Sequence, residues 1–307
     1  MKNTINFYYN IFLDELIKKD NCYYFYYGGD EYYFVPLNRP YDDVQSIYKL
    51  NLEMKKRRCL VHELVLNKDK SIITIVNGIS YVLIKLCKYK NDKVFLNDIN
   101  YIQNMTVNIE CDKSLVRNEW IKLWSEKIDY YEYQISQVGK KYPLLCDSLS
   151  YFIGMGENAI SYLVNNLDSK TNVNLVVSHK RIYQERGSLN FYDPLNFVVD
   201  SRVRDVAEFI KETFYNKTLN LYDLKSYFNM ANLNKNEYIL LLGRLLFPTY
   251  YFDIYDDIIN KGKSEELVIN IIDRTDEYES LLNTIYKFIL YEKKARLEPI
   301  EWLQDKN

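Results

Sequence analysis

The sequence is poor in the residues that build metal and redox sites. Its 307 residues include only 2 His, 9 Gly, 6 Pro and 5 Cys. The cysteines are odd in number, widely spaced and never arranged as a CxxC pair, which favours free thiols in a reducing compartment over a disulfide scaffold. Neither His62 nor His179 lies near a cysteine pair, so a structural zinc site is not expected, and a Cys-His hydrolase has no supporting spacing.

Long apolar runs and an excess of one charge are also missing. No segment approaches the roughly 20 consecutive apolar residues of a membrane span, and residues 1–8 lack the charged start and apolar stretch of a secretory signal. We therefore expect no membrane span and synthesis in the cytoplasm. Forty Lys and Arg residues against 42 Asp and Glu give a net charge of -2, which offers no basic field for a nucleic-acid partner.

What the sequence does contain is typical of a soluble globular protein. Hydrophobic residues make up 48% and charged residues 27%, which excludes intrinsic disorder and a collagen-like repeat. Tyrosine is unusually abundant, at 31 residues. Exposed tyrosines could couple oxidatively, but many stand at periodic positions such as Tyr131, where they serve as amphipathic packing residues. The tyrosines therefore indicate a fold more than a chemistry.

The first 90 residues carry mostly β-strand patterns. Two aromatic runs around Gly28-Gly29-Asp30 predict a hairpin over residues 21–37, with Pro36 ending its second strand or placing that strand at an edge. Residues 40–55 predict a helix with an acidic start and a basic end. Three short β-rich runs follow, at residues 60–66, 71–76 and 79–86.

Beyond the polar connector at residues 87–92, the apolar period becomes helical. Residues 114–138 and 143–166 predict two long helices, the second beginning at a proline. We then expect a strand at 173–177, a loop at 179–187, a second strand at 188–192, and a helix capped by Asp200-Ser201. Residues 221–303 are helical by period, with breaks at Pro248 and around Gly262.

This order of elements resembles the protein-kinase-like fold, and its second part resembles that of the aminoglycoside phosphotransferases. The resemblance is carried by Val176-Val177-Ser178-His179, by Leu189-Asn190-Phe191-Tyr192-Asp193, by the run from Asp200 to Ile210 and by the run from Arg244 to Asp253. Together these segments are most similar to the YutH branch of the CotS-like spore coat proteins. The resemblance implies an α+β, bilobal fold, with a small β-rich N-lobe at residues 1–90 and a larger helical C-lobe at residues 91–307.

Departures from the kinase pattern bear on activity. The family pattern His-x-Asp-x-x-x-x-Asn, started at His179, puts Arg181 at the catalytic aspartate and Arg186 at the magnesium-binding asparagine. An arginine cannot accept a proton from a hydroxyl nucleophile, and it repels a metal cation. Residues 32–37 offer no lysine for the phosphates, and the Gly28-Gly29 turn lacks a third glycine. Asp193 alone matches a metal ligand, with Glu53 as a candidate helix carboxylate.

Each of these residues also has a structural interpretation. His179 could be a general base, but at the end of a strand we expect it to brace the loop. Asp193 could bind magnesium, yet it precedes Pro194, which favours a turn-forming aspartate. Arg181 and Arg186 could instead contact an anion or an acidic partner surface, or could simply be solvated.

Three further features also have a structural interpretation. The basic cluster at residues 55–58 suits a solvated helix end better than a binding patch. Gly154 and Gly156, inside an apolar helix, indicate close packing rather than a phosphate loop. Asp205 is expected to brace the catalytic-like loop or to pair with a nearby arginine.

We therefore expect no catalytic residue and no cofactor. The hypothesis is a pseudokinase that acts by binding as a spore coat component or assembly factor, made in the mother cell, located in the coat and partnered by other coat proteins. The coat assignment rests on the resemblance alone. The alternative is a divergent phosphotransferase that uses ATP and Mg, with Asp193 as the metal ligand. A plain interaction domain without a nucleotide cleft is a third hypothesis.

Overall fold

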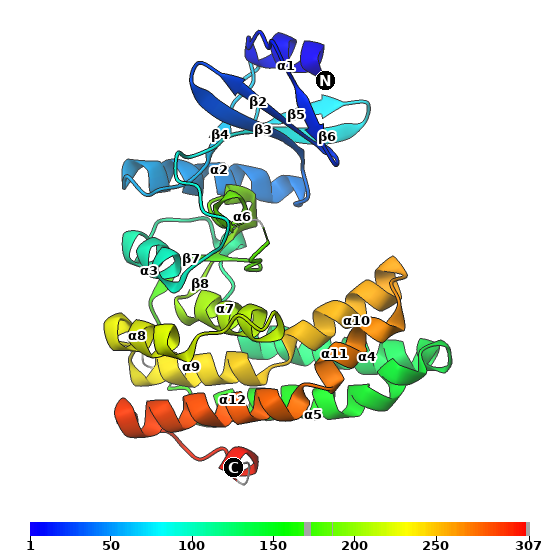
Figure 1. Ribbon diagram of the computed structural model, residues 1–307, viewed down its shortest axis with the longest axis vertical. Coiled ribbons are helices and arrows are strands. Elements are labelled where there is room, and N and C mark those ends of the chain that lie inside the picture. Colours follow the sequence, from blue (N-terminus) through cyan, green and yellow to red (C-terminus); the bar gives the residue numbers. More distant parts are fainter. Residues whose placement is uncertain (169–172, 186, 305–307) are drawn as a thin grey trace. The chain divides into compact units, whose positions relative to one another are not determined.

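The computed structural model describes residues 1–168, 173–185 and 187–304. The chain forms two compact units, which are described separately (Figure 1). The first, called the sheet unit below, consists of Met1–Arg117 and Asn174–Arg202; the second, called the helical unit, consists of Asn118–Val173 and Val203–Asn307. The division into lobes at residues 1–90 and 91–307 stays a prediction.

The sheet unit is built on an antiparallel sheet with the strand order β1-β2-β3-β6-β4, and β5 pairs with β6. Its strands are β1 (Ile17–Lys19), β2 (Cys22–Tyr27), β3 (Asp30–Pro36), β4 (Glu63–Val65), β5 (Ile73–Val76) and β6 (Ile79–Lys85). The predicted hairpin is confirmed: Tyr27 pairs with Asp30 across Gly28 and Gly29, whose φ angles are 60° and 82°. Positive φ at both turn positions is the reason for two glycines. Pro36 ends β3, which lies inside the sheet.

Helices pack on this sheet and below it. Helix α2 (Tyr41–Lys56) has the predicted acidic first turn and basic last turn, and it buries Val44, Ile47 and Leu50. Two helices, α1 (Lys2–Tyr9) and α3 (Leu96–Met105), were not expected from the sequence, and neither was β1. Ile5 of α1 enters a core cluster with Phe25 and Phe34 of the hairpin.

The returning segment of the sheet unit corrects one prediction. Of residues 188–192, expected as a strand, 188–191 belong to the short helix α6 (Gly187–Phe191). The partner of β7 (Leu175–His179) is instead β8 (Phe197–Ser201), in which all five residues are buried. Residues 188–192 cannot pair with β7 because Ser188 is hydrogen-bonded to the connector: its backbone N–H donates to the Asn91 carbonyl, and its Oγ accepts from the Asn91 N–H. A short apolar run does not distinguish strand from helix by periodicity.

Two helix starts also differ from expectation. Asp200 and Ser201 end β8, and α7 (Val203–Tyr215) begins after them. The helix expected from residue 114 is α4 (Trp120–Val138). Its start is delayed because Lys113–Leu115 form a 3-10 turn and the Arg117 N–H donates to the Val199 carbonyl of β8, which holds this segment extended.

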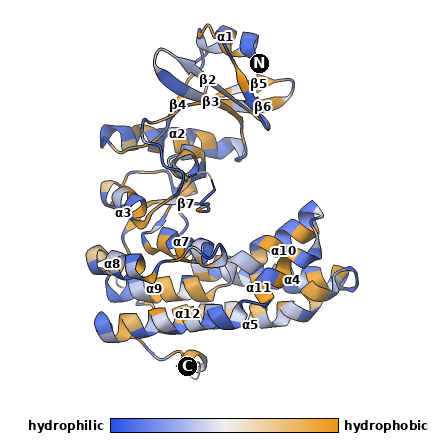
Figure 2. Ribbon diagram, viewed as in Figure 1, coloured by the Kyte–Doolittle hydropathy of each residue, from blue (hydrophilic) through white to orange (hydrophobic). Residues whose placement is uncertain are grey.

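The helical unit contains α4, α5 (Pro143–Asn166, as predicted), α7, α8 (Leu221–Ala231), α9 (Lys235–Leu246), α10 (Thr249–Lys261), α11 (Ile269–Ile272), α12 (Thr275–Lys287) and α13 (Glu301–Gln304). The predicted breaks are confirmed, since Pro248 precedes α10 and Gly262 ends it in a left-handed conformation. Helix α9 packs on α5, α7 and α12, and the hydrophobic faces of these helices are visible in Figure 2.

Glycines set the closest helix contacts in this unit. A Cβ atom at Gly156 of α5 would lie 2.9 Å from the Ile128 side chain of α4. A Cβ at Gly243 of α9 would overlap Leu163 of α5. Gly156 therefore confirms the close-packing interpretation, whereas Gly154 has open space around it. Within the described residues, no helix is both long and apolar enough to cross a membrane.

Candidate functional site

His179 lies at the end of β7, where the sequence predicts it, and its imidazole is buried. Its Nε2 is 2.7 Å from the Phe191 carbonyl oxygen of α6. The ring stacks on Phe191 with centroids 4.3 Å apart, and Phe197 meets it edge-on at 5.3 Å. These contacts hold α6 against the β7–β8 pair, as a bracing residue would.

The two arginine positions follow β7. The Arg181 Nη1 donates to the Lys180 carbonyl at 2.8 Å, and the Arg181 carbonyl accepts from the Asn196 Nδ2 at 2.9 Å. Arg181 thus lies beside the turn that leads into β8. Arg186 lies outside the described residues.

Asp193 does not end the strand that pairs with β7, as its match to a kinase metal ligand required: that strand, β8, ends at Asp200-Ser201, and Asp193 stands just before the 3-10 turn Pro194–Asn196. Its Oδ1 accepts from the Leu195 N–H at 2.8 Å, so the carboxylate caps this turn. Burial raises its pKa to about 6, while the Leu195 amide, Arg39 and His179 act in the opposite direction. Among the described residues, no group of three or more His, Cys, Asp or Glu side chains is arranged to hold a metal ion.

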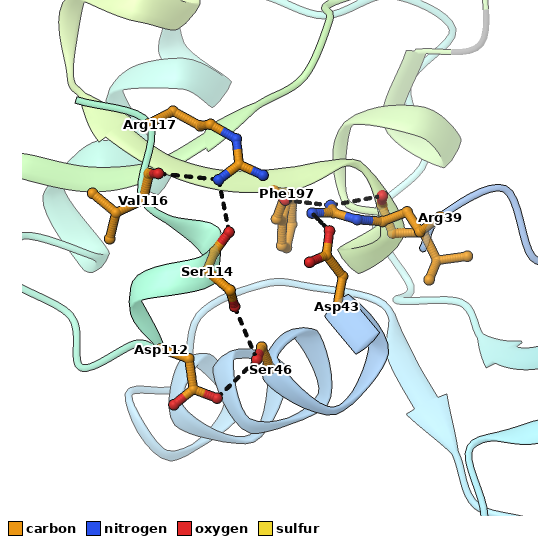
Figure 3. Close-up of polar contacts among 9 residues, drawn as sticks. Arg39, Asp43, Ser46, Asp112, Ser114, Val116, Arg117 and Phe197 are labelled. Atoms are coloured by element: carbon orange, nitrogen blue, oxygen red, sulfur yellow. Dashed lines mark hydrogen bonds and ion pairs between the residues drawn. The ribbon is translucent and has the colours of Figure 1, made fainter. Parts of the chain in front are cut away.

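Arg39, which the sequence analysis missed, is a buried cation that contacts this turn (Figure 3). Its Nη1 donates to the carbonyls of Leu195 at 3.1 Å and Phe197 at 2.6 Å, and its Nη2 contacts the Asp43 Oδ2 at 3.2 Å. Burial lowers the pKa of Arg39. The only sequence signal was the four-residue spacing from Arg39 to Asp43, which allows an ion pair.

Two more cations lie near Arg39. Burial lowers the pKa of Lys180 to about 8, and the neighbouring Arg39 and Arg117 add to that effect, with Asp43 opposing it. The Arg117 Nη1 donates to the Ser114 carbonyl at 2.7 Å (Figure 3). The turn at Asp193 therefore lies beside a group of three cations, Arg39, Lys180 and Arg117. We call this group the basic end.

Helix α2 is tied to this region by a polar chain. The Ser46 Oγ donates to the Asp112 Oδ2 at 2.8 Å and accepts from the Ser114 Oγ at 3.2 Å (Figure 3). Glu53, the candidate helix carboxylate, instead pairs with Lys56 at 3.1 Å and Arg57 at 3.6 Å in its own helix and C-cap.

Two pockets border β3. The larger, of about 520 Å³, is lined by residues of the sheet, the connector and α6: Lys19, Asp20, Tyr24, Glu31, Tyr33, His62, Leu86, Cys87, Tyr89, Lys90, Asn91, Asp92, Glu185, Ser188 and Leu189. The smaller, of about 270 Å³, also contains Tyr33 and Leu189 and reaches Asp193. Of the described β3 residues, Glu31, Tyr33, Val35 and Pro36 line these pockets, and none is a lysine.

His62 forms the inner wall of the larger pocket. Its Nδ1 accepts from the Cys87 N–H at 3.1 Å, and its Nε2 contacts the Leu189 carbonyl at 3.2 Å. These two partners require the neutral tautomer with the proton on Nε2. Burial lowers the pKa of His62 to about 4. The residue therefore links the connector to α6 in its neutral form, a role that no sequence pattern indicated.

Comparison with solved structures defines the class of fold. An aminoglycoside phosphotransferase from Alicyclobacillus acidocaldarius superposes with a TM-score of 0.64 at 10% identity, covering 92% of this chain and 94% of that one. A spectinomycin phosphotransferase in complex with ADP and spectinomycin gives 0.58 at 9% identity, covering 86% and 89%. The predicted kinase-like α+β fold is therefore confirmed.

Within that class, the chain belongs to the family described as "Spore coat putative kinase YutH", whose family model matches residues 2–285. A curated relative, the endospore coat-associated protein YutH of Bacillus subtilis, is 29% identical over 208 residues. That match spans 60% of this chain and 61% of the relative's length. The resemblance stated from the sequence motifs is confirmed.

Proposed function

We propose that this protein is a catalytically inactive kinase-fold protein that acts by binding in the spore coat. Its membership of a spore coat family and its similarity to an endospore coat-associated protein support the coat location. The partners we propose are other coat proteins, and we propose synthesis in the mother cell. The absence of activity rests on the site residues.

The observation that carries the proposal is the basic end. The resemblance puts Arg181 where a kinase has its catalytic carboxylate, and the carboxylate that caps the turn, Asp193, has Arg39 and His179 close enough to affect its pKa. Magnesium in phosphoryl transfer needs oxygen ligands, and catalysis consists mostly of positioning and charge neutralisation. Cations at these positions repel a metal ion, and an arginine cannot accept the proton of the attacking hydroxyl.

The residues around the pockets also do not fit a magnesium nucleotide. A triphosphate needs positive charge and backbone donors along its path. Here β3 presents Tyr33 and Val35, and the larger pocket adds four carboxylates, Asp20, Glu31, Asp92 and Glu185. We therefore propose no reaction that uses ATP.

A ligand-binding experiment tests the proposal. Mg-ATP added at up to millimolar concentration should leave the thermal midpoint of the purified protein unchanged, because only a ligand that binds the native state raises it. Phosphate release should not exceed the buffer blank. Micromolar affinity with measurable phosphate release would contradict the proposal.

The divergent phosphotransferase remains the second candidate, favoured by one observation. Asp193 uses its Oδ1 to cap the turn, and its pKa of about 6 leaves it ionised at pH 7. If it held a metal, Asp193→Ala should abolish any activity, while Asp69→Ala, at an exposed turn, should not. Equal activity in both variants removes this candidate.

The coat location is tested separately. A fluorescent fusion expressed from the native promoter should concentrate around the forespore during sporulation and stay with the purified spore. A signal that remains diffuse in the mother cell would contradict the coat role without bearing on catalysis.

A further inference from the structure

The larger pocket of the sheet unit is negatively charged. Four carboxylates and two lysines line it, which gives a formal charge of -2 with His62 neutral. Lys90 is already ion-paired with Glu31. The remaining carboxylates, Asp20, Asp92 and Glu185, are exposed at the pocket and are available to a ligand. This field repels phosphates and attracts cations.

The pocket wall supplies a second, independent feature. Tyr24 and Tyr33 stack with their centroids 4.2 Å apart, and Tyr89 lies on the connector side. Leu86 and Leu189 add aliphatic surface. Aromatic faces attract organic cations, and aliphatic surface accommodates the stem of a lysine or arginine side chain. A volume of about 520 Å³ is large enough for such a chain.

Two backbone donors of the connector are directed away from the pocket. The Cys87 N–H donates to His62, and the Asn91 N–H donates to the Ser188 Oγ. A Cβ at Gly187 would overlap the backbone of Asn91 and Asp92, so α6 sits directly on this segment. A flat heterocycle that relies on these amides would have to break native hydrogen bonds.

We infer that this pocket binds an organic cation, an alkylammonium or guanidinium group on an aliphatic chain, in place of a nucleotide. The inference rests on the proposed function, because a binding protein needs a ligand that its cleft can hold. The cation can come from two sources, a free polyamine or a basic side chain of a protein partner, and the chemistry recognised is the same.

Calorimetric titration of the whole protein at low ionic strength tests the inference. The probes are spermidine, Nα-acetyl-lysine amide, and a decapeptide with one central lysine beside its norleucine counterpart. In the double variant Asp20→Asn/Asp92→Asn the pocket carries no net charge, and both side chains are exposed. Asparagine tolerates the φ of 56° at Asp20. We expect cation affinity to fall at least about fivefold.

The matched control is Asp14→Asn/Asp69→Asn, which removes two exposed charges from the same unit away from the pocket and should leave affinity unchanged. Thermal midpoints of both double variants report whether they fold. Binding of spermidine but not of the peptide identifies a polyamine, and preference for lysine over norleucine identifies a protein side chain.

Two results would overturn the inference: no heat with any cationic probe, or equal loss of affinity in both double variants. If neither ATP nor a cation binds, this inference fails while the proposed function stands. If ATP binds and is hydrolysed, the proposed function fails, and so does the inference that rests on it.

Discussion

The two pockets that meet at Tyr33 and Leu189 differ in how their charges are used. In the larger pocket, Asp20, Asp92 and Glu185 are exposed at the rim. At the basic end, next to the smaller pocket, the guanidinium of Arg39 is buried and bonded to two carbonyls. Exposed charge can change partners on binding, whereas buried charge that is already bonded cannot do so without cost.

This difference indicates that the larger pocket is available to a ligand, whereas the basic end beside the smaller pocket stabilises the fold. Arg39 joins the start of α2 to the turn before β8, and His179 joins β7 to α6. In an active phosphotransferase the region of this turn would hold metal and phosphate. Here cations and backbone carbonyls satisfy one another instead.

Among variants that test this difference between the two pockets, Arg39→Met should have the largest effect on stability. The substitution keeps the aliphatic volume but leaves the Leu195 and Phe197 carbonyls and Asp43 without their donor. We expect the free energy of unfolding to fall by about 3 to 5 kcal/mol, the usual cost of breaking a buried charge network. Urea denaturation followed by circular dichroism measures it.

Lys56→Met is the control for this variant, since the Lys56 side chain is 75% exposed and its partner Glu53 also contacts Arg57. A change below about 1 kcal/mol is expected there. If Arg39→Met lowered the free energy of unfolding no more than the control does, the basic end would not be structural.

A second test concerns His62, which links the connector to α6 in the wall of the larger pocket. His62→Leu leaves the Cys87 amide and the Leu189 carbonyl without a partner, which should cost about 2 to 4 kcal/mol at pH 7. The pKa of His62 falls from 6.5 to about 4 on folding. The unfolded chain therefore binds the proton more readily, and this contribution to stability is lost as the pH falls from 6.5 towards 4.

Urea unfolding of parent and variant from pH 7.5 to 4.5 separates this contribution from the others, because the remaining groups are common to both proteins. The difference in unfolding free energy should narrow on acidification. A difference that is independent of pH would mean that His62 does not link the connector to α6 in its neutral form.

Local patterns predicted well wherever neighbours in sequence decide the structure. The Gly28-Gly29 hairpin and the helix begun by Pro143 are such cases. The helix α6 could not be predicted, because its identity depends on hydrogen bonds between Ser188 and Asn91, 97 residues apart. Arg39 meets Leu195 across 156 residues, and a single sequence contains no trace of that contact. The motif around His179 correctly predicted a strand ending at this residue, but not the residues that surround it.

The smallest effect is expected from Asp193→Asn, and its sign separates the two candidate functions. Asparagine can still accept from the Leu195 amide. Because the pKa of Asp193 rises from 3.8 to about 6 on folding, the folded protein loses stability as the pH increases from 3.8 through 6.

At pH 7 the ionised carboxylate therefore lowers the free energy of unfolding. The asparagine variant should be more stable by about 1 to 2 kcal/mol, a value that already allows for the partial exposure of Asp193. This gain should be absent below about pH 4. Urea unfolding at pH 7 and pH 3.5, with Asp69→Asn as the exposed control, measures it. A loss of stability at pH 7 that appears only when magnesium is present would show that Asp193 holds a metal, and the basic end would then be functional after all.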